Sequence, residues 1–417
     1  MASLRFLLGL LPETAKYEFS SDKLRSDYIE YKKYETSEDL RNYESLERKV
    51  TTSEFRDKVK AIKSLRYKKS YEYSQEKEYL RLLKSKPYLR YQKLRILNPG
   101  QGSPEYLDFK NLENSLEAKR ITELESIIKS DKFQQTKRYL SLSSSERFSQ
   151  SEEYEKLTEY ERQRKSEKVL WYKNIKKKYP FSEIEKWDVA FEEKFESGKV
   201  DQKKWMNRYL YGDKLLKKGY VLGDDIHAFT EGKNLEIYDR KLRIITRREK
   251  AKSLVWNPAL GFYEREFEFT SDLLSSANGY RNKYGIYEAK VRIADSGVTQ
   301  AFSLMSDQIV PHIDIFKFSN GKLLSGNFWQ NGSGIKKSIS STRGVKYTKD
   351  FYIYSLEWQP GKLVWRVNGV IFKEQTTGLP DNDMFMVFNS SLKEKSNQKG
   401  IPSIMEIDWI RVYTRKQ

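Results

Sequence analysis

The sequence predicts an α region followed by a β region. Residues 17–179 contain almost no proline or glycine outside Pro87 and the Asn98–Pro104 break. They are rich in Glu, Lys, Leu, Arg and Tyr, a composition that favours helices. We therefore expect a helical region over residues 1–180 and a region of strands over residues 181–417.

A short run of lysines marks the boundary between the two regions. Lys176–Lys178 is followed at once by Tyr179 and Pro180, and a proline after a charged run is typical of a linker. Beyond it, tryptophans stand in alternating patterns that indicate buried strands, and we expect them in the core: Trp358, Trp365 and Trp409.

The helical region shows amphipathic spacing and recognisable helix starts. Ser37 before Glu38-Asp39 and Thr52 before Ser53-Glu54 have the pattern of helix N-termini. Apolar residues recur three and four positions apart after the first of these starts, at Leu40, Tyr43, Leu46 and Val50.

A weak internal repeat runs through the same region. Tyr73–Leu82 is echoed 75 residues later by Phe148–Leu157. The echo predicts two or more copies of a helical-hairpin unit, joined at Asn98–Pro104. Such helical repeats offer long docking surfaces, and we expect the aromatic residues to staple the helices together. Chance similarity within a biased composition is the alternative.

Net charge restricts the partners. The chain has 417 residues and a formal net charge of +19. A basic field favours an anionic polysaccharide, an acidic protein or nucleic acid, although nucleic acid is supported by no motif. A well-solvated lysine-rich surface is the plain alternative. Protein partners are expected to bind through residues 1–180.

Cysteine usage and the start of the chain carry less information. The absence of cysteine excludes disulfides and thiolate chemistry. The apolar run Phe6–Leu11 is too short to span a membrane and is followed by no clear signal-peptide cleavage site. We expect it to be a docking segment, and the compartment stays open between the cell surface and a large assembly.

Eight short motifs stand in one order between Trp187 and Tyr413. The clearest are Tyr284–Ile293, Ala301–Met305, Leu356–Pro360, Trp365–Gly369 and Met405–Tyr413. Together they resemble glycoside hydrolase family 16, the group of laminarinases, lichenases and agarases. The resemblance implies a concanavalin A-like β-sandwich of the jelly-roll type.

The catalytic strand departs from that family. His312, Asp314 and Lys317 stand where the resemblance implies Glu-x-Asp-x-x-Glu, so only the middle carboxylate remains. Retaining hydrolysis needs two carboxyl groups about 5–5.5 Å apart. We therefore predict no catalytic residue here. The three side chains either form a structural cluster or recognise an acidic sugar, sulfate or phosphate.

Other residues are candidates for contact with a sugar. Trp329 is predicted as a stacking platform, with Asn327 and Gln330 contacting hydroxyl groups. Trp329 as a packing residue is the alternative. Arg281 is a further candidate, whereas Ser303 stands where the family carries a tryptophan platform.

No cofactor or metal ion is expected. Lys194 replaces the glutamate that helps hold a structural calcium in many family members, while Asp408 remains at the other end of that site and leaves calcium open.

Three functions follow from these features. The leading one is a non-catalytic module, glycan-binding or structural, docked through the helical arm onto a larger assembly. The second is a structural component of a virion, secretion or surface complex without sugar binding. The third is an active glycoside hydrolase with unusual catalytic groups.

Overall fold

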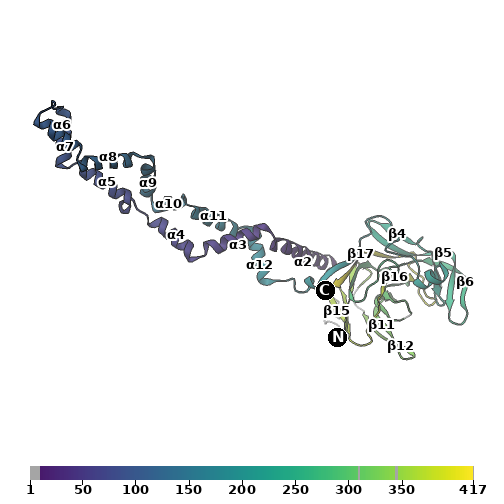
Figure 1. Ribbon diagram of the computed structural model, residues 1–417. Coiled ribbons are helices and arrows are strands. Elements are labelled where there is room, and N and C mark those ends of the chain that lie inside the picture. The colour runs from purple at the N-terminus through teal and green to yellow at the C-terminus, as the bar shows by residue number, and fades with distance from the viewer. Residues whose placement is uncertain (1–9, 309, 343–345, 417) are drawn as a thin grey trace. The chain divides into compact units, whose positions relative to one another are not determined.

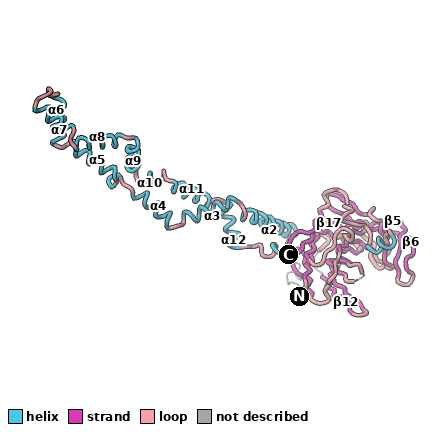
Figure 2. Tube along the Cα trace, viewed as in Figure 1, coloured by secondary structure: helices cyan, strands magenta, loops and turns pink. Residues whose placement is uncertain are grey.

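The computed structural model describes residues 10–308, 310–342 and 346–416. The chain forms two compact units, one built from residues up to Tyr28 together with Pro180–Gln417, and the other from Ile29–Tyr179. Helices fill the second unit and strands the first (Figures 1 and 2). The predicted order of an α region and then a β-sandwich is confirmed.

The division differs from the predicted one at the start of the chain. The sequence places residues 1–180 together, but the described residues 10–28 belong with the sandwich. We call Leu10–Tyr28 the N-terminal strap. It includes the first part of helix α2, whose polar side chains bond to the sandwich. Such pairing between residues more than 300 positions apart leaves no local trace in a sequence.

The helical unit is a ladder folded back on itself. Its helices are α2 (Thr14–Glu35, from Ile29), α3 (Glu38–Val50), α4 (Ser53–Ser64), η1 (Tyr67–Lys69), α5 (Tyr71–Leu82), α6 (Lys86–Leu97), α7 (Pro104–Glu113), α8 (Leu116–Lys129), α9 (Asp131–Ser141), α10 (Ser144–Ser149), α11 (Glu152–Arg164) and α12 (Glu167–Lys178). Helix α3 packs on α11, α4 on α10, α5 on α8, and α6 on α7.

This pairing corrects the predicted joint. Asn98–Pro104 does not connect two hairpin copies but is the turn of a single long hairpin, since α6 and α7 on either side of it pack together. Asn98 ends α6 in the left-handed conformation at φ 44°. The echoed segments lie in α5 and in α10–α11, which pack on different partners.

Serine and threonine caps define the helices of this unit. The predicted starts are confirmed, because Ser37 accepts a hydrogen bond from the Leu40 N–H and Thr52 from the Phe55 N–H. The same bond, each typically worth about 1 kcal/mol, recurs at the start of later helices: Ser70, Ser85, Ser103, Ser115, Ser130, Ser143, Ser151 and Ser166.

Aromatic side chains hold the two rows of helices together. The rings of Tyr43 and Tyr160 stack at 5.8 Å between α3 and α11, and Tyr31 stacks on Tyr172 at 5.2 Å. The Tyr43 hydroxyl donates to Glu47 at 2.8 Å. These tyrosines are packing residues, as the sequence predicts.

The sandwich has two sheets. One has the order β15-β14-β13-β8-β17-β5-β6-β3, with β1, β2 and β4 paired at its side, and the other β12-β11-β10-β9-β16-β7. The strands are β1 (Trp187–Glu193), β2 (Tyr220–Leu222), β3 (His227–Phe229), β4 (Leu235–Tyr238), β5 (Lys241–Asn257), β6 (Gly261–Ser271), β7 (Leu273–Ser275), β8 (Gly285–Arg292), β9 (Thr299–Met305), β10 (His312–Ser319), β11 (Lys322–Asn331), β12 (Gly334–Thr342), β13 (Tyr352–Gln359), β14 (Lys362–Val367), β15 (Val370–Gln375), β16 (Phe385–Ser391) and β17 (Ser403–Arg415).

The core lies between the two sheets. Alternate residues of each strand face it, because successive side chains of a strand point to opposite faces. Leu304, Ile313 and Phe388 from the six-stranded sheet meet Leu356 and Trp358 from the larger one. The other face of the six-stranded sheet, which we call the outer face, is therefore lined by the residues between these.

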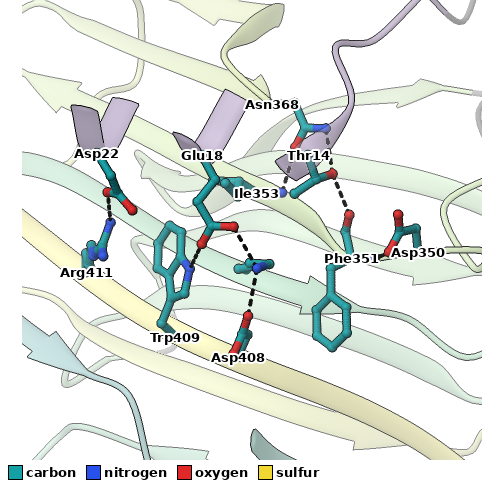
Figure 3. A network of polar contacts seen from close by, with 11 residues as sticks. Thr14, Glu18, Asp22, Asp350, Phe351, Ile353, Asn368, Asp408, Trp409 and Arg411 are labelled. Carbon is teal, nitrogen blue, oxygen red and sulfur yellow. Dashed lines mark hydrogen bonds and ion pairs between the residues drawn. The ribbon is translucent and has the colours of Figure 1, made fainter. Parts of the chain in front are cut away.

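The N-terminal strap lies on the larger sheet (Figure 3). Glu18 accepts hydrogen bonds from the Trp409 indole N–H at 2.6 Å and from Lys290 Nζ at 2.7 Å. Lys290 also pairs with Asp408 at 2.8 Å. Lys290 on β8 is thus shared by two carboxylates, Glu18 of the strap and Asp408 of β17.

Three further contacts hold the strap on the sandwich. Thr14 donates to the Phe351 carbonyl at 2.6 Å, and Asn368 Nδ2 donates to Thr14 Oγ1 at 2.9 Å. Asp22 pairs with Arg411 at 2.9 Å (Figure 3). Of the predicted docking segment Phe6–Leu11, residues 6–9 lie outside the described part of the chain. Leu11 packs against the sandwich core, so it is not a free tip.

Candidate functional site

The strand that carries the candidate site contains a bulge. On β10, Asp314 pairs with Gly326 of β11 and Lys317 with Leu324, so three steps on one strand match two on the other. Ile315 and Phe316 are both buried. The extra residue returns Lys317 to the face of Asp314. The structure thus brings His312, Asp314 and Lys317 together on the outer face.

Asp314 is held by two neighbours. His312 Nε2 lies 2.7 Å from Asp314 Oδ1, and Ser303 Oγ donates to the same oxygen at 2.8 Å. Asp314 is only 7% exposed. Ser303, which stands in place of the expected tryptophan, therefore serves as a partner of the carboxylate.

The charge state of Asp314 follows from these contacts. Burial favours the neutral acid, but the charge and hydrogen bond of His312, the charge of Lys317 and the bond from Ser303 outweigh it and lower the pKa of Asp314. The group is therefore a carboxylate near neutral pH, able to accept hydrogen bonds but not to donate a proton.

A transverse row of side chains crosses the outer face beside this pair. Adjacent strands place Phe385, Met305, His312, Phe328 and Lys337 opposite one another in that order. The row ends in an exposed lysine on β12 and carries an aromatic ring next to the histidine. The rings of His312 and Phe328 meet edge to face at 5.5 Å.

Phe328 lies over a glycine. A side chain at Gly326 would meet the Phe328 ring at 3.1 Å and Ile339 at 3.3 Å. The missing side chain therefore lets the ring lie along the sheet, next to Asp314. Phe328 was not among the residues predicted from the sequence. The tight turn after Ser319, which makes β10 and β11 a hairpin and pairs His312 with Phe328, was the signal that could have revealed it.

Two predicted contact residues lie on the opposite face. Asn327 is fully buried and donates to the Gly378 carbonyl at 2.7 Å. Trp329 shares its face, and its ring covers Gly378 so closely that no side chain would fit there. Register thus places Phe328 rather than Trp329 beside His312.

The two other predicted contact residues, Gln330 and Arg281, lie at the edges of the outer face. Gln330 is exposed and donates to the Gly332 carbonyl at 2.6 Å in its own turn. Arg281 lies over the Phe385 ring at 4.9 Å, at the end of the row away from Lys337, and pairs with Asp307. Arg281 thus joins the outer face, whereas Gln330 belongs to the β11–β12 turn.

Two residues that the sequence did not single out as part of the site support β10 and β11 from behind. The Trp365 indole N–H donates to the Asp314 carbonyl at 3.0 Å, and Lys373 Nζ lies over the Trp365 ring at 4.5 Å. Lys373 also donates to the carbonyls of Ser325 and Ser338, at 3.3 and 2.5 Å. Strands β14 and β15 thereby fix the site strands. Trp358, Trp365 and Trp409 are buried as predicted.

Lys373 makes stability depend on pH. Burial lowers its pKa to about 8, and the charge of Asp314 offsets this only in part. The unfolded lysine titrates near 10.4, so between pH 8 and 10 the unfolded chain binds more protons and stability rises with pH. We expect a gain of up to about 3 kcal/mol across this range, lost in Lys373→Met.

Urea unfolding at several pH values measures this effect. Lys362→Met is the matched control, since that lysine is half exposed and pairs with Glu374. The range ends at pH 10, because buried tyrosines such as Tyr354, whose pKa is raised by burial, act in the opposite direction above it. An equal slope in both variants would contradict the assignment.

Both residues compared above with the family's calcium site make ion pairs within the protein. Asp408 is bonded to Lys290, and Lys194 lies 3.2 Å from Glu192. Within the described parts of the chain, no group of three or more histidine, aspartate or glutamate side chains is placed to hold a metal ion. Nor does any described helix combine the length and apolar character needed to cross a membrane.

Comparison with known proteins finds relatives of the sandwich. Residues 224–411 match the family model described as glycosyl hydrolases family 16. A beta-glucanase of Paenibacillus macerans is 26% identical over 140 residues, which is 31% of this chain and 59% of that protein. Glucan endo-1,3-beta-glucosidase A1 of Niallia circulans is 20% identical over 263 residues, 54% of this chain and 38% of that protein. The chain thus spans less than two thirds of these relatives.

Solved structures resemble the same part. The laminarinase catalytic domain of Thermotoga maritima MSB8 has a TM-score of 0.45 at 19% identity and covers 55% of this chain and 99% of its own. The resemblance predicted from the motifs is confirmed by the family model, which ends within β17. Residues 224–411 of this protein are therefore similar to glycosyl hydrolases family 16.

Proposed function

We propose that the sandwich binds a polysaccharide on its outer face without hydrolysing it, and that an anionic chain fits best. The observation that carries the proposal is that the Asp314 carboxylate is already held by neighbouring side chains. This carboxylate is engaged by His312 and Ser303, and Lys317 lies on the same face.

The chemistry of hydrolysis argues for binding alone. A retaining glycosidase needs a nucleophilic carboxylate and a carboxylic acid about 5–5.5 Å apart, and an inverting one also needs two carboxyl groups. The lowered pKa keeps Asp314 ionised, so it cannot protonate the leaving oxygen. Lysine side chains keep their proton near neutral pH and are poor acids there.

The transverse row supplies the features of a sugar site. Phe328 offers an aromatic face, which suits the apolar side of a sugar ring. Arg281 and Lys337 place cations at the two ends of the row, and Lys317 lies nearby. These charges favour carboxylated or sulfated sugars, whose binding weakens as salt rises. The similar proteins named as glucanases support polysaccharide as the ligand class.

Removal of the Phe328 ring tests the proposal. We expect Phe328→Ala to weaken binding by roughly 1–3 kcal/mol, because a stacking surface is lost. Trp329→Ala should bind as the native protein does, since its ring packs on Gly378. Affinity electrophoresis in laminarin, lichenan and carrageenan gels measures this. Binding that is lost in Trp329→Ala and kept in Phe328→Ala would refute the site.

The same preparations test catalysis. No reducing ends should appear from these polysaccharides above a buffer blank. Turnover that survives purification and disappears in Asp314→Asn would show that the module is an enzyme. Absence of binding to every polysaccharide, neutral or anionic, would favour a purely structural module.

We also infer that the helical unit docks this module onto a larger assembly. The unit exposes large apolar side chains that its own helices leave uncovered, among them Leu80, Leu89, Ile96, Leu107 and Leu116. Deletion of residues 29–179 is therefore expected to release the sandwich from its assembly, measured by fractionation of the source cells.

A further inference from the structure

The turn of the helical ladder has an unusual charge pattern. Between Tyr79 and Pro104 the chain carries no aspartate or glutamate, although 59 of its 417 residues are acidic. The same segment holds the cations Arg81, Lys84, Lys86, Arg90, Lys93 and Arg95. All six are exposed, and one of them, Arg90, pairs with Asp108 of α7 at 2.6 Å. The segment comprises the end of α5, α6 and the turn into α7.

Helix α6 has an apolar stripe on its exposed side. Leu94 is 8% exposed and is the buried residue of this helix. Leu89 and Ile96 are seven residues apart, two helical turns, and so lie above one another. They are 46% and 86% exposed and lie on the side of α6 away from Leu94. Leu97 is 72% exposed but follows Leu94 by three residues, so it lies on the side of Leu94 and outside the stripe.

Cations border this stripe. Lys86 and Lys93 are also seven residues apart, so they follow one edge of it, and Arg95 lies on the other edge. Lysines and arginines are attracted to an anionic membrane surface, and aliphatic side chains beside them can be buried among the headgroups.

We propose that α6 and the turn after it form a docking surface for an anionic lipid bilayer, with Leu89 and Ile96 entering the headgroup region. The charge is complementary, since phosphate headgroups meet an acid-free cationic segment. The helix lies along the interface, because no described helix is long and apolar enough to span a membrane.

Two other occupants fit less well. A partner peptide needs a groove, but the cavity lined by Pro87, Tyr88 and Leu112 has a volume of about 10 Å³. Proteins that bind single-stranded nucleic acid stack its bases on free aromatic faces. Tyr91 is instead stacked on Phe109 at 5.3 Å. A fluid bilayer requires neither feature.

Vesicle sedimentation of the full chain tests the proposal. Vesicles of phosphatidylcholine with phosphatidylglycerol should sediment the protein, and vesicles of pure phosphatidylcholine should not. We expect Lys86→Gln with Lys93→Gln to lower the binding constant about fivefold per charge removed. Leu89→Ser with Ile96→Ser should lower it at least tenfold, because each buried apolar side chain contributes. Ile96→Trp should show a blue shift of fluorescence on binding.

Matched controls lie elsewhere on the helical unit. Lys49→Gln with Lys60→Gln removes two exposed lysines, and Leu170→Ser removes a 55% exposed leucine. Both should bind as the native protein does, and circular dichroism should show all variants folded. Failure to sediment, or equal loss in the controls, overturns the proposal. The proposal is also overturned if binding is lost in the lysine variant but unchanged in the Leu89→Ser, Ile96→Ser variant, because the protein then adsorbs through charge alone.

The proposal rests on the docking role inferred for the helical unit, but the two fail separately. Sedimentation tests lipid alone, whereas deletion of residues 29–179 tests docking to any partner. One informative result is that the Leu89→Ser, Ile96→Ser variant stays in its assembly although it no longer binds vesicles. That result would support the docking role of the helical unit and would contradict lipid as the surface to which it docks.

Discussion

Removal of the N-terminal strap is expected to destabilise the sandwich by on the order of 5 kcal/mol. Without residues 1–28, the Trp409 indole N–H and Lys290 lose Glu18, and Asn368 loses Thr14. Hydrogen bonds to charged groups contribute about 1.5–3 kcal/mol each. Loss of several of them is large against a typical total of 5–15 kcal/mol.

A single substitution isolates the central contact. Glu18→Ala should cost about 1–3 kcal/mol, because the Trp409 N–H is left without its acceptor while Lys290 keeps Asp408. Glu13→Ala is the control, since Glu13 is exposed and pairs with exposed Lys16. Its effect should fall within about 0.5 kcal/mol.

Tryptophan fluorescence reports on the correct unit. Of the eight tryptophans only Trp171 lies in the helical unit, so a Trp171→Phe background makes the signal specific for the sandwich. A synthetic peptide of residues 10–28 added to the truncated chain should restore part of the lost stability. Equal unfolding midpoints for residues 29–417 and the full chain would refute the strap.

The second large effect is expected at Trp365. Trp365→Ala should destabilise the sandwich by about 3–5 kcal/mol, because a fully buried indole is replaced by a cavity. The change also removes the donor to the Asp314 carbonyl and leaves the charge of Lys373 without its aromatic neighbour. It therefore loosens β10 and β11 as well as the core.

Two variants separate these contributions. Trp365→Phe keeps most of the packing and loses the indole N–H, so it should cost about 1–3 kcal/mol. Trp256→Ala is the control, because that tryptophan is 37% exposed on β5. Chemical denaturation followed by circular dichroism gives the free energy of unfolding. A loss in Trp256→Ala as large as in Trp365→Ala would show that Trp365 has no special role.

The helices and strands could be predicted from patterns of neighbouring residues. The caps at Ser37 and Thr52 and the composition of residues 17–179 predicted helices, because helix formation depends on neighbours within one turn. The motifs from Tyr284 to Tyr413 predicted the sandwich, since alternating apolar residues specify which face of each strand is buried. The serine caps also recur at Ser37, Ser70 and Ser103, 33 residues apart, a signal that would have located more of the helices.

Other features depended on contacts between distant residues. A shift of one residue in register exchanges the two faces of a strand, so only the pairing of β10 with β11 decided that Phe328 and not Trp329 lies beside His312. The bulge at Asp314 likewise decided the face of Lys317.

Composition and motif spacing were enough to predict the class of each region and the resemblance of the sandwich to a known family, because both depend on residues close together in the chain. Only the tertiary structure decided that the ladder turns at Asn98–Pro104, that Lys373 and Trp365 support the site, and that the strap belongs to the sandwich. Each of these depends on packing between segments far apart in the chain, such as Glu18 with Trp409, and composition carries no record of which distant segment a side chain will meet.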